Sequence, residues 1–414
     1  GESMKKMLIK NIGILATAEG RQARRGEEQG KIRLYKNAWI LLEDDEIVEI
    51  GTGKYQYQND FDGEVLDAED RLVTPGLVDA HTHLVFGGWR QNELGLKMHG
   101  VSYLEILANG GGILSTVENT REASLEELMD KAEKALDEML NFGTTTCEAK
   151  SGYGLNLEHE LKQLKVVREL NRRHPIDLIS TFLGAHAIPV DYKNEREEFI
   201  RQICEDMIPI IAEEKLAQFC DVFCETGVFT VEEARRILET GKKYGLIPKI
   251  HADEIEAIGG SQLAGNIGAI SAEHLIVCPL EGIEQMAKGR TIACLLPATS
   301  FYLGANYAPA REMIQRGVPV AMATDFNPGS CPCLNLQLVI NLGCLKYRMT
   351  PEEVLTAVTL NAAAAIGVAD RIGTIEIGKK GDLIIWEAPD LDYICYRLGS
   401  NLVRNVVKAG KKIR

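Results

Sequence analysis

The hydrophobic pattern divides the chain into a long middle region and two shorter ends. From about residue 76 to residue 370, short apolar runs with the composition of strands alternate with segments in which apolar residues recur every three or four positions. This alternation predicts repeated β-α units and a parallel sheet. Eight strands are expected, at residues 77–83, 144–150, 178–186, 219–225, 248–252, 269–274, 291–296 and 318–325.

Two helices of the middle region can be placed from the residues at their ends. Ser124 and Glu127 have the spacing of a capping box in front of a run with helical period, which Gly143 should end. Another helix should begin after Thr350, where the next residue is a proline, and should continue to near Gly367.

Eight β-α units spread over about 290 residues fit a (β/α)8 barrel of the TIM type. A doubly wound sheet is the structural alternative. The glycines at 110–112 do not favour it, because no G-x-G-x-x-G follows an expected strand and no G-K-[ST] occurs in the chain. The expected fold class is therefore α/β with a barrel, and no bound nucleotide is expected.

The two ends of the chain resemble each other and lack helical periodicity. Both contain short β-rich pieces separated by glycines and charged turns. Strands are expected near the N-terminus at residues 7–14, 38–42 and 47–50, and near the C-terminus at residues 372–377, 383–386 and 403–407.

Composition narrows the classes of function. The 414 residues are 45% apolar and 26% charged, as in folded globular proteins. The 46 Lys and Arg against 60 Asp and Glu give a net charge of −14, which disfavours nucleic acids and anionic membranes as partners. No apolar run approaches the roughly 18 residues of a membrane-spanning helix. The ten cysteines lie mostly in apolar runs, which favours reduced thiols in the cytoplasm.

The histidines are placed as they would be in a metal site. The chain has eight, and five of them fall at the end of an expected strand: His81, His83, His186, His251 and His274. In a (β/α)8 barrel these ends meet at one mouth, and Asp325 ends the eighth strand there. In a strand, His81 and His83 would point to the same face about 6.5 Å apart. Such a pair is weak support alone, but the whole set indicates a metal centre.

Residues 72–80, which read LVTPGLVDA and precede this pair, resemble the opening segment of the amidohydrolase superfamily. Five further motifs follow in the order found in that family and extend the resemblance over nearly the whole chain. They are VFGG at 85–88 with Arg90, KSGYG at 150–154, GAHA at 184–187, HADE at 251–254 and DFNPGS at 325–330.

The resemblance implies a protein of two parts. Amidohydrolases of this type combine a (β/α)8 barrel with a small β-sandwich built from both termini, which agrees with the similar ends of this chain. We therefore expect the N-terminal part of the sandwich domain at residues 1–75, the metallo-hydrolase barrel at 76–370, and the C-terminal part of the sandwich domain at 371–414.

The resemblance also implies one Zn²⁺ or Fe ion per chain, held by His81, His83, His251 and Asp325. A binuclear site is not expected. Relatives with two metals usually carry a bridging carboxylated lysine on the fourth strand, whereas the fourth strand here ends in Cys224 and Glu225. Lys150 lies on the second strand, and we expect it to pair with a neighbouring carboxylate.

Three residues are expected to carry chemistry: Glu254, His274 and Asp325. Glu254 or Asp325 would accept a proton from the attacking water and return one to the leaving nitrogen. His274 would either stabilise developing charge or only hydrogen-bond Asp325. The positions expected to contact substrate are Arg90, Tyr153, His186, Glu254, Asn327, Gly329 and Ser330. Of these, Arg90 offers a guanidinium fork to a substrate carboxylate.

The activity implied is metal-dependent hydrolysis of the cyclic amide of 4-imidazolone-5-propanoate to N-formimidoyl-L-glutamate, a step of histidine degradation. The partner is then this small molecule, and a homodimer is expected. One alternative is a cytosine or guanine deaminase of the same superfamily, against which Arg90 and Tyr153 argue, since a nucleobase has no carboxylate. The other is a non-catalytic scaffold, which would be expected to have lost a metal ligand.

Overall fold

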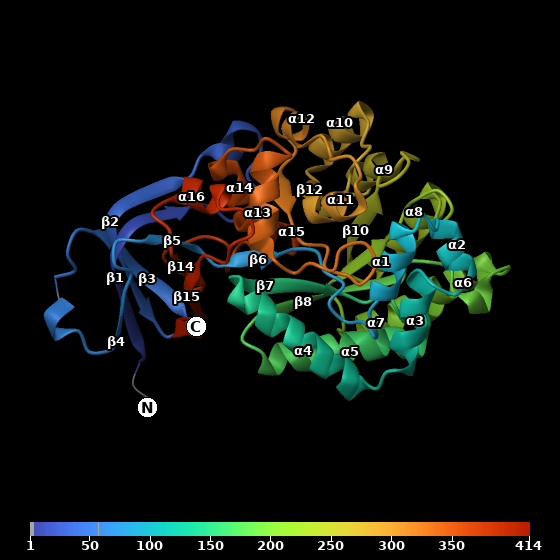
Figure 1. Ribbon diagram of the computed structural model, residues 1–414, viewed down its shortest axis with the longest axis horizontal. Coiled ribbons are helices and arrows are strands. Elements are labelled where there is room, and N and C mark those ends of the chain that lie inside the picture. The colour runs from blue at the N-terminus through green and yellow to red at the C-terminus, as the bar shows by residue number, and fades with distance from the viewer. Residues whose placement is uncertain (1–3, 57) are drawn as a thin grey trace.

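The computed structural model describes residues 4–56 and 58–414, and these residues form a barrel with a smaller sheet at one side (Figure 1). The first three residues of the N-terminal segment expected at 1–75 lie outside the described residues. The C-terminus of the chain lies beside the smaller sheet (Figure 1).

Eight parallel strands form the barrel, in the order β13-β12-β11-β10-β9-β8-β7-β6. They are β6 (Leu77–Asp79), β7 (Thr144–Lys150), β8 (Asp177–Ala185), β9 (Phe219–Val222), β10 (Ile247–Ala252), β11 (Ser271–His274), β12 (Ile292–Leu295) and β13 (Val320–Met322). Each lies within or next to an expected strand, so the predicted (β/α)8 fold class is confirmed. Most strand residues are buried, as in parallel sheets covered by helices.

The barrel closes just beyond its first and last strands. The backbone N–H of Asp325 donates to the carbonyl of His81 at 2.9 Å, and that of His83 donates to the carbonyl of Phe326 at 2.8 Å. Thr82 and Phe326 form an isolated parallel bridge there. This closure places two histidines and one aspartate side by side at the carboxyl ends of the strands.

Helices follow the strands and cover the outside of the barrel (Figure 1). They are α1 (Gln91–Met98), α2 (Tyr103–Ala108), α3 (Ile113–Glu122), α4 (Leu125–Asn141), α5 (Leu157–Arg173), α6 (Arg196–Gln202), α7 (Ile208–Glu213), α8 (Val231–Lys243), α9 (Gly260–Asn266), α10 (Leu280–Gly289), α11 (Pro297–Leu303), α12 (Ala310–Gln315), α13 (Leu336–Leu345), α14 (Pro351–Val358), α15 (Leu360–Ala365) and α16 (Leu391–Tyr396). Short 3-10 helices are η1 (Gly26–Gly30), η2 (Gln58–Asp60) and η3 (Val190–Tyr192), and a π-helical turn, η4 (Ile203–Met207), joins α6 to α7. None of the helices in the described residues is long and apolar enough to cross a membrane.

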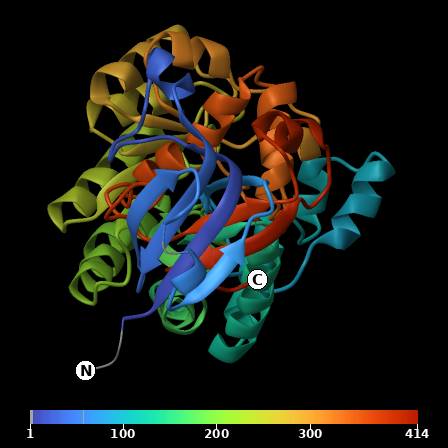
Figure 2. The same ribbon diagram turned by 90° about the vertical axis from the view of Figure 1, so that its left-hand side faces the viewer.

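The smaller sheet is mixed and draws strands from both ends of the chain (Figure 2). Its strands are β1 (Lys6–Thr17), β2 (Arg33–Glu43), β3 (Glu46–Thr52), β4 (Glu64–Asp67), β5 (Leu72–Pro75), β14 (Leu383–Trp386), β15 (Val403–Lys408) and β16 (Lys411–Lys412). β5 lies between β1 and β14, and the indole of Trp386 donates to Thr74 Oγ1 at 2.8 Å. The two termini therefore build one unit, while the domain boundaries remain a prediction.

One strand predicted in this region is wrong. Residues 372–377 form bends and a turn instead of a strand, with left-handed glycines at 373 and 378. The segment is apolar because it joins two cores: Ile372 packs in a barrel cluster, and Ile375 packs in the core of the smaller sheet.

The two expected helix starts are present, with differences in detail. Ser124 caps α4 by accepting from the N–H of Glu127 at 3.1 Å, but the Glu127 carboxylate accepts from the Ser124 hydroxyl and so leaves the box one-sided. Thr350 begins α14 with a complete capping box. The helix expected to reach Gly367 is broken at Thr359, which has a backbone φ of −128° and donates its hydroxyl to the carbonyl of Leu355.

Candidate metal centre and active site

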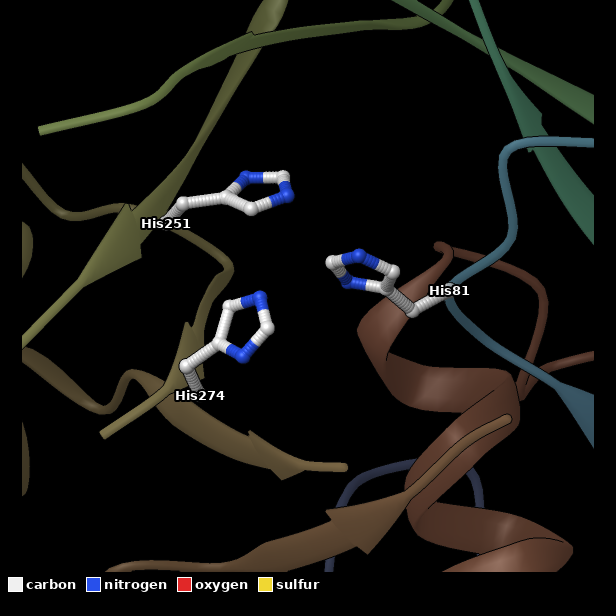
Figure 3. A group of neighbouring side chains, drawn as sticks. All are labelled: His81, His251 and His274. Carbon is white, nitrogen blue, oxygen red and sulfur yellow. The ribbon is translucent and has the colours of Figure 1, made fainter. Parts of the chain in front are cut away.

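The expected metal ligands converge at the mouth of the barrel. His81 and His83 follow β6, His251 lies on β10, and Asp325 follows β13. His274, which ends β11, joins them: Figure 3 shows its ring facing those of His81 and His251 across a common space. The ring centroids of His81 and His251 are 4.8 Å apart, and those of His251 and His274 are 5.4 Å apart.

The ring nitrogens and carboxylate oxygens of these residues lie close together, and several of them lack a hydrogen-bond partner. Asp325 Oδ1 lies 3.0 Å from His81 Nε2 and 3.2 Å from His83 Nε2. Within the described residues, His81 Nε2, His251 Nε2 and Asp325 Oδ1 are buried with no hydrogen bond. Buried polar atoms are rarely left unsatisfied. Imidazole nitrogens and a carboxylate oxygen gathered in this way fit a transition-metal ion.

The structure adds His274 to the candidate ligands. The possible ligand atoms fall into two overlapping groups, in each of which all atoms lie within 4.8 Å of one another. One group is His81, His83 and Asp325, and the other is His81, His251 and His274. His274 Nε2 lies 3.5 Å from Glu254 Oε2 and 3.8 Å from Asp325 Oδ2, so it stands between the two expected proton carriers.

Two of these residues have a backbone conformation that side chains rarely adopt. His274 has a φ of 75° and Asp325 a φ of 58°, both in the left-handed region. Such a conformation costs on the order of 1–3 kcal/mol and persists where the surroundings impose it. At Asp325 the imposing contacts are the closure hydrogen bond to His81 and a 2.8 Å hydrogen bond from the Thr299 hydroxyl to Oδ2. Thr299 was not expected from the sequence.

A network of buried charges lies beneath the metal centre. Lys150 Nζ donates to Glu148 Oε2 at 2.7 Å and to Asp221 Oδ2 at 2.8 Å, as expected for a lysine paired with carboxylates. Asp221 Oδ1 is 3.1 Å from His251 Nδ1. This contact makes Nδ1 the protonated nitrogen of His251 and leaves Nε2 free toward the mouth.

The charges in this network set the pKa values around it. Burial alone would raise the pKa of Asp221, but His251 and Lys150 outweigh it and hold that pKa well below the usual value. Burial likewise opposes the charged form of Lys150, yet Asp221, Glu148 and Glu273 hold its pKa above the usual value. Asp221 is therefore a carboxylate and Lys150 an ammonium throughout the neutral range.

Sequence reasoning missed most of this network. Glu148, Asp221, Lys249 and Glu273 are fully buried within barrel strands, and Lys249 Nζ lies 3.7 Å from Glu273 Oε1. The sequence does show them as charged residues inside otherwise apolar strands. A charged side chain can be buried there only when a partner of opposite charge lies beside it. Without the fold, no pairing among them could be assigned.

The loop after β7 is organised by another buried carboxylate that the sequence did not single out. Glu160 accepts from the Ser151 hydroxyl at 2.7 Å and from the N–H groups of Gly152 and Gly154 at 3.0 and 2.9 Å. The loop in turn positions Tyr153, whose ring lies 5.3 Å from that of His186. Of the two His186 nitrogens, Nδ1 contacts the Gly152 carbonyl at 2.8 Å.

Arg90 lies at the cavity as expected, but it is not a free guanidinium. Its Nε and Nη2 donate to the two carboxylate oxygens of Glu93 at 3.0 and 3.1 Å. A guanidinium has five N–H donors, so the end formed by Nη1 and Nη2 can still meet a second carboxylate. Position 329 must be a glycine to leave this guanidinium in place, because a Cβ there would collide with Arg90 Nη1.

The loop after Asp325 is held in shape by hydrogen bonds within the loop itself. The Asn327 side chain accepts from the N–H of Gly329 at 2.9 Å and of Ser330 at 2.8 Å, and donates to the Asp325 carbonyl at 2.7 Å. Asn327 therefore shapes this loop in addition to lining the site.

A single cavity of about 620 Å³ brings the expected substrate residues together. It is lined by Arg90, Tyr153, His186, Glu254, Asn327, Gly329 and Ser330, and by four residues of the candidate metal centre, His83, His251, His274 and Asp325. Burial raises the pKa of Glu254 above its usual value, although nearby His274 partly opposes this shift. A carboxyl group with a raised pKa beside a metal centre suits proton transfer near neutral pH.

The sequence model of the amidohydrolase family matches residues 72–413. The imidazolonepropionase of Alkaliphilus metalliredigens is 52% identical over 415 residues, covering 99% of this chain and 98% of that protein. The imidazolonepropionase of Brevibacillus brevis is 50% identical, covering 98% and 97%. An adenosine deaminase from Xanthomonas campestris with bound zinc has a TM-score of 0.69 at 19% identity, covering 99% of this chain and 92% of that one, and shares the fold.

We expect Asp221→Asn to weaken metal binding about 10- to 100-fold, the usual effect of removing a hydrogen-bond partner from a metal-bound histidine. Metal affinity is measured by competition with a chelator. Asp382→Asn is the matched control, because Asp382 is also a buried aspartate paired with a buried lysine, Lys408 at 2.6 Å, but in the smaller sheet. Equal losses of affinity in both variants would show that Asp221 acts only through general stability.

Proposed function

This chain belongs to the amidohydrolase family, and on that premise we propose that it hydrolyses the cyclic amide of 4-imidazolone-5-propanoate to N-formimidoyl-L-glutamate. It is a hydrolase related over nearly its whole length to imidazolonepropionases, enzymes of histidine degradation. The observation that carries the proposal is that one cavity contains both the cluster of histidines and Asp325 that could hold a metal ion and the end of the Arg90 guanidinium that Glu93 does not use.

Family and cluster together indicate a metal cofactor. We propose that His81, His83, His251 and Asp325 hold one Zn²⁺ or Fe ion, a donor set that suits either metal. When bound, the ion would activate water for attack and polarise the ring carbonyl. His274 borders the same space and is a further candidate ligand beside these four.

We expect one metal ion per purified chain, because the donor atoms surround a single space. Plasma emission analysis measures this ratio, and His251→Ala should lose the metal because a neutral nitrogen ligand is removed. Two ions per chain in fully active protein would contradict the mononuclear site.

The protein side chains then handle the protons and the substrate. Glu254 accepts the proton of the attacking water and returns it to the ring nitrogen that leaves, while His274, 3.5 Å away, stabilises the carboxylate form present before the first transfer and after the second. Arg90 binds the propionate with the end of its guanidinium that Glu93 does not use. Tyr153 and His186 fix the planar ring.

The deaminase alternative is not favoured. The relatives that are about half identical are imidazolonepropionases, and the likeness to a deaminase at 19% identity concerns the fold alone. A nucleobase would also leave the free end of Arg90 without a carboxylate. The direct test follows the ultraviolet absorbance of freshly generated imidazolone propionate with and without the protein, and unchanged decay would refute the proposed activity.

Glu254→Gln should retain the fold and the metal but lose about 10² to 10⁴ in kcat, because an amide cannot exchange the proton. Steady-state kinetics and metal analysis of the same preparation check this. The control is Glu256→Gln, which changes a nearby carboxylate that accepts a hydrogen bond from the Thr226 hydroxyl at 2.8 Å. Near-normal kcat in Glu254→Gln would move the proton transfer to Asp325 or His274.

Arg90→Met should weaken substrate binding by about two to three and a half orders of magnitude, since breaking a buried ion pair costs about 3–5 kcal/mol. The substitution also leaves Glu93 unpaired, so Arg90→Lys, which keeps the charge but loses the fork, is measured beside it. The decisive comparison uses an analogue with a neutral chain in place of the propionate. If the original protein and Arg90→Met discriminate equally against this analogue, Arg90 does not bind the carboxylate.

We further propose that the protein acts in the cytoplasm as a homodimer, on the resemblance to its family. All ten cysteines are free thiols, which suits a reducing compartment.

A further inference from the structure

A second cavity, of about 400 Å³, lies at the end of the barrel opposite the metal centre. Ile292 begins β12 and Pro319 directly precedes β13, so the cavity lies at the amino ends of strands whose carboxyl ends face the mouth. Its other walls come from residues 21–25, between β1 and η1, and from the turn after α15. The cavity is therefore separate from the site of hydrolysis.

Three arginines line this cavity: Arg21, Arg25 and Arg290. Their side chains form no ion pair or hydrogen bond with any residue in 4–56 or 58–414. Arg24, between the first two, instead donates to the Glu19 carbonyl and pairs with Glu28. The cavity is therefore lined by three arginines whose charges are unpaired among the described residues.

The cavity lining carries an excess of positive charge although the whole chain has a net charge of −14. Its one carboxylate, Asp370, lies 4.0 Å from Arg371, which is not part of the lining. Lys379, almost fully buried, donates to the carbonyl of Ala369 in the cavity wall at 2.8 Å. Burial lowers the pKa of this lysine, although Glu376 partly opposes the shift. Positive charge therefore exceeds negative charge in the cavity lining, where three arginines stand against Asp370, while Lys379 beside it is paired with Glu376 at 3.6 Å.

The backbone that carries two of these arginines is held in place. The N–H of Arg24 donates to Asn361 Oδ1 at 2.8 Å, and Asn361 Nδ2 returns a hydrogen bond to the Arg24 carbonyl at 3.0 Å. On the other side, the N–H of Gly20 donates to Glu376 at 2.8 Å. Because Arg21 and Arg25 flank these anchors, only side-chain freedom remains to be lost when a ligand binds.

We propose that this cavity binds a small multivalent anion bearing phosphate or carboxylate groups. Guanidinium groups match the oxygens of both kinds of anion in paired hydrogen bonds. The volume of about 400 Å³ fits a compact molecule, and Ile292 and Pro319 offer an apolar wall to its carbon or ester part. The ligand would bind far from the metal centre, and occupancy need not change the basal reaction.

The test is calorimetric titration of the intact chain with pyrophosphate and, separately, with citrate, with sodium chloride holding the ionic strength constant. These two anions distinguish phosphate from carboxylate ligands. We expect saturable binding of one anion per chain with a Kd below about 1 mM for at least one of them. Arg290→Gln should weaken it roughly ten-fold or more, because hydrogen bonds to charged groups are lost.

Arg168→Gln is the matched control, since Arg168 is also an exposed arginine of the barrel but lies on α5, outside the cavity. It should bind the anion as the unchanged chain does. Arg290 is exposed, so the Arg290→Gln variant should fold, and its unchanged imidazolone hydrolysis verifies this. Binding of neither anion, or equal binding by Arg290→Gln and Arg168→Gln, would overturn the proposal.

Discussion

The structure depends on how the first and last barrel strands meet. β6 and β13 stand at the two ends of the eight-stranded sheet, and hydrogen bonds between the residues that follow them complete the ring. Asp79, 245 positions from Thr324, supports this junction by accepting from the Thr324 N–H at 3.1 Å and from its hydroxyl at 2.6 Å. Because His81 and Asp325 lie in the closing segments, the hydrogen bonds that close the barrel also bring these two proposed metal ligands together. A change that loosens the junction therefore acts on fold and site together.

The interior beneath this junction is unusual for a barrel core, which is commonly filled by branched apolar side chains. Here Lys150 and Lys249 are fully buried among Glu148, Asp221 and Glu273. Buried ion pairs seldom add net stability, because desolvation offsets their attraction. Their use lies in orientation: Asp221 joins Lys150 to His251, and Glu273 Oε1 lies 3.7 Å from Lys249 and 3.5 Å from His81 Nδ1. The network thus supports two of the imidazoles from the side facing away from the mouth.

The sequence could predict what depends on local pattern and on spacing along the chain. It located all eight barrel strands, the capping of α4 and α14, and the histidines that end the strands, because period, caps and strand ends are encoded locally. It could not predict that Glu93 binds one edge of the Arg90 guanidinium or that Glu160 organises the loop of Tyr153. Both contacts depend on which polar groups the tertiary fold buries away from solvent. The false strand at 372–377 has the same origin: its apolar residues serve two different cores, and the local pattern does not distinguish this from a strand.

The arrangement of the candidate metal ligands is unfavourable in free energy, and the interactions of the rest of the fold offset this. His274 and Asp325 have left-handed backbones, and His81 Nε2 and His251 Nε2 are buried without hydrogen bonds among the described residues. Both features disfavour the folded chain by itself. A cation that binds only the folded form recovers this free energy, because binding to the native state adds to its stability. The buried network limits how far the imidazoles can rearrange to find other partners. The unsatisfied nitrogens therefore remain available to a ligand, and the same rigidity holds Glu254 beside His274, as the proposed proton transfer requires.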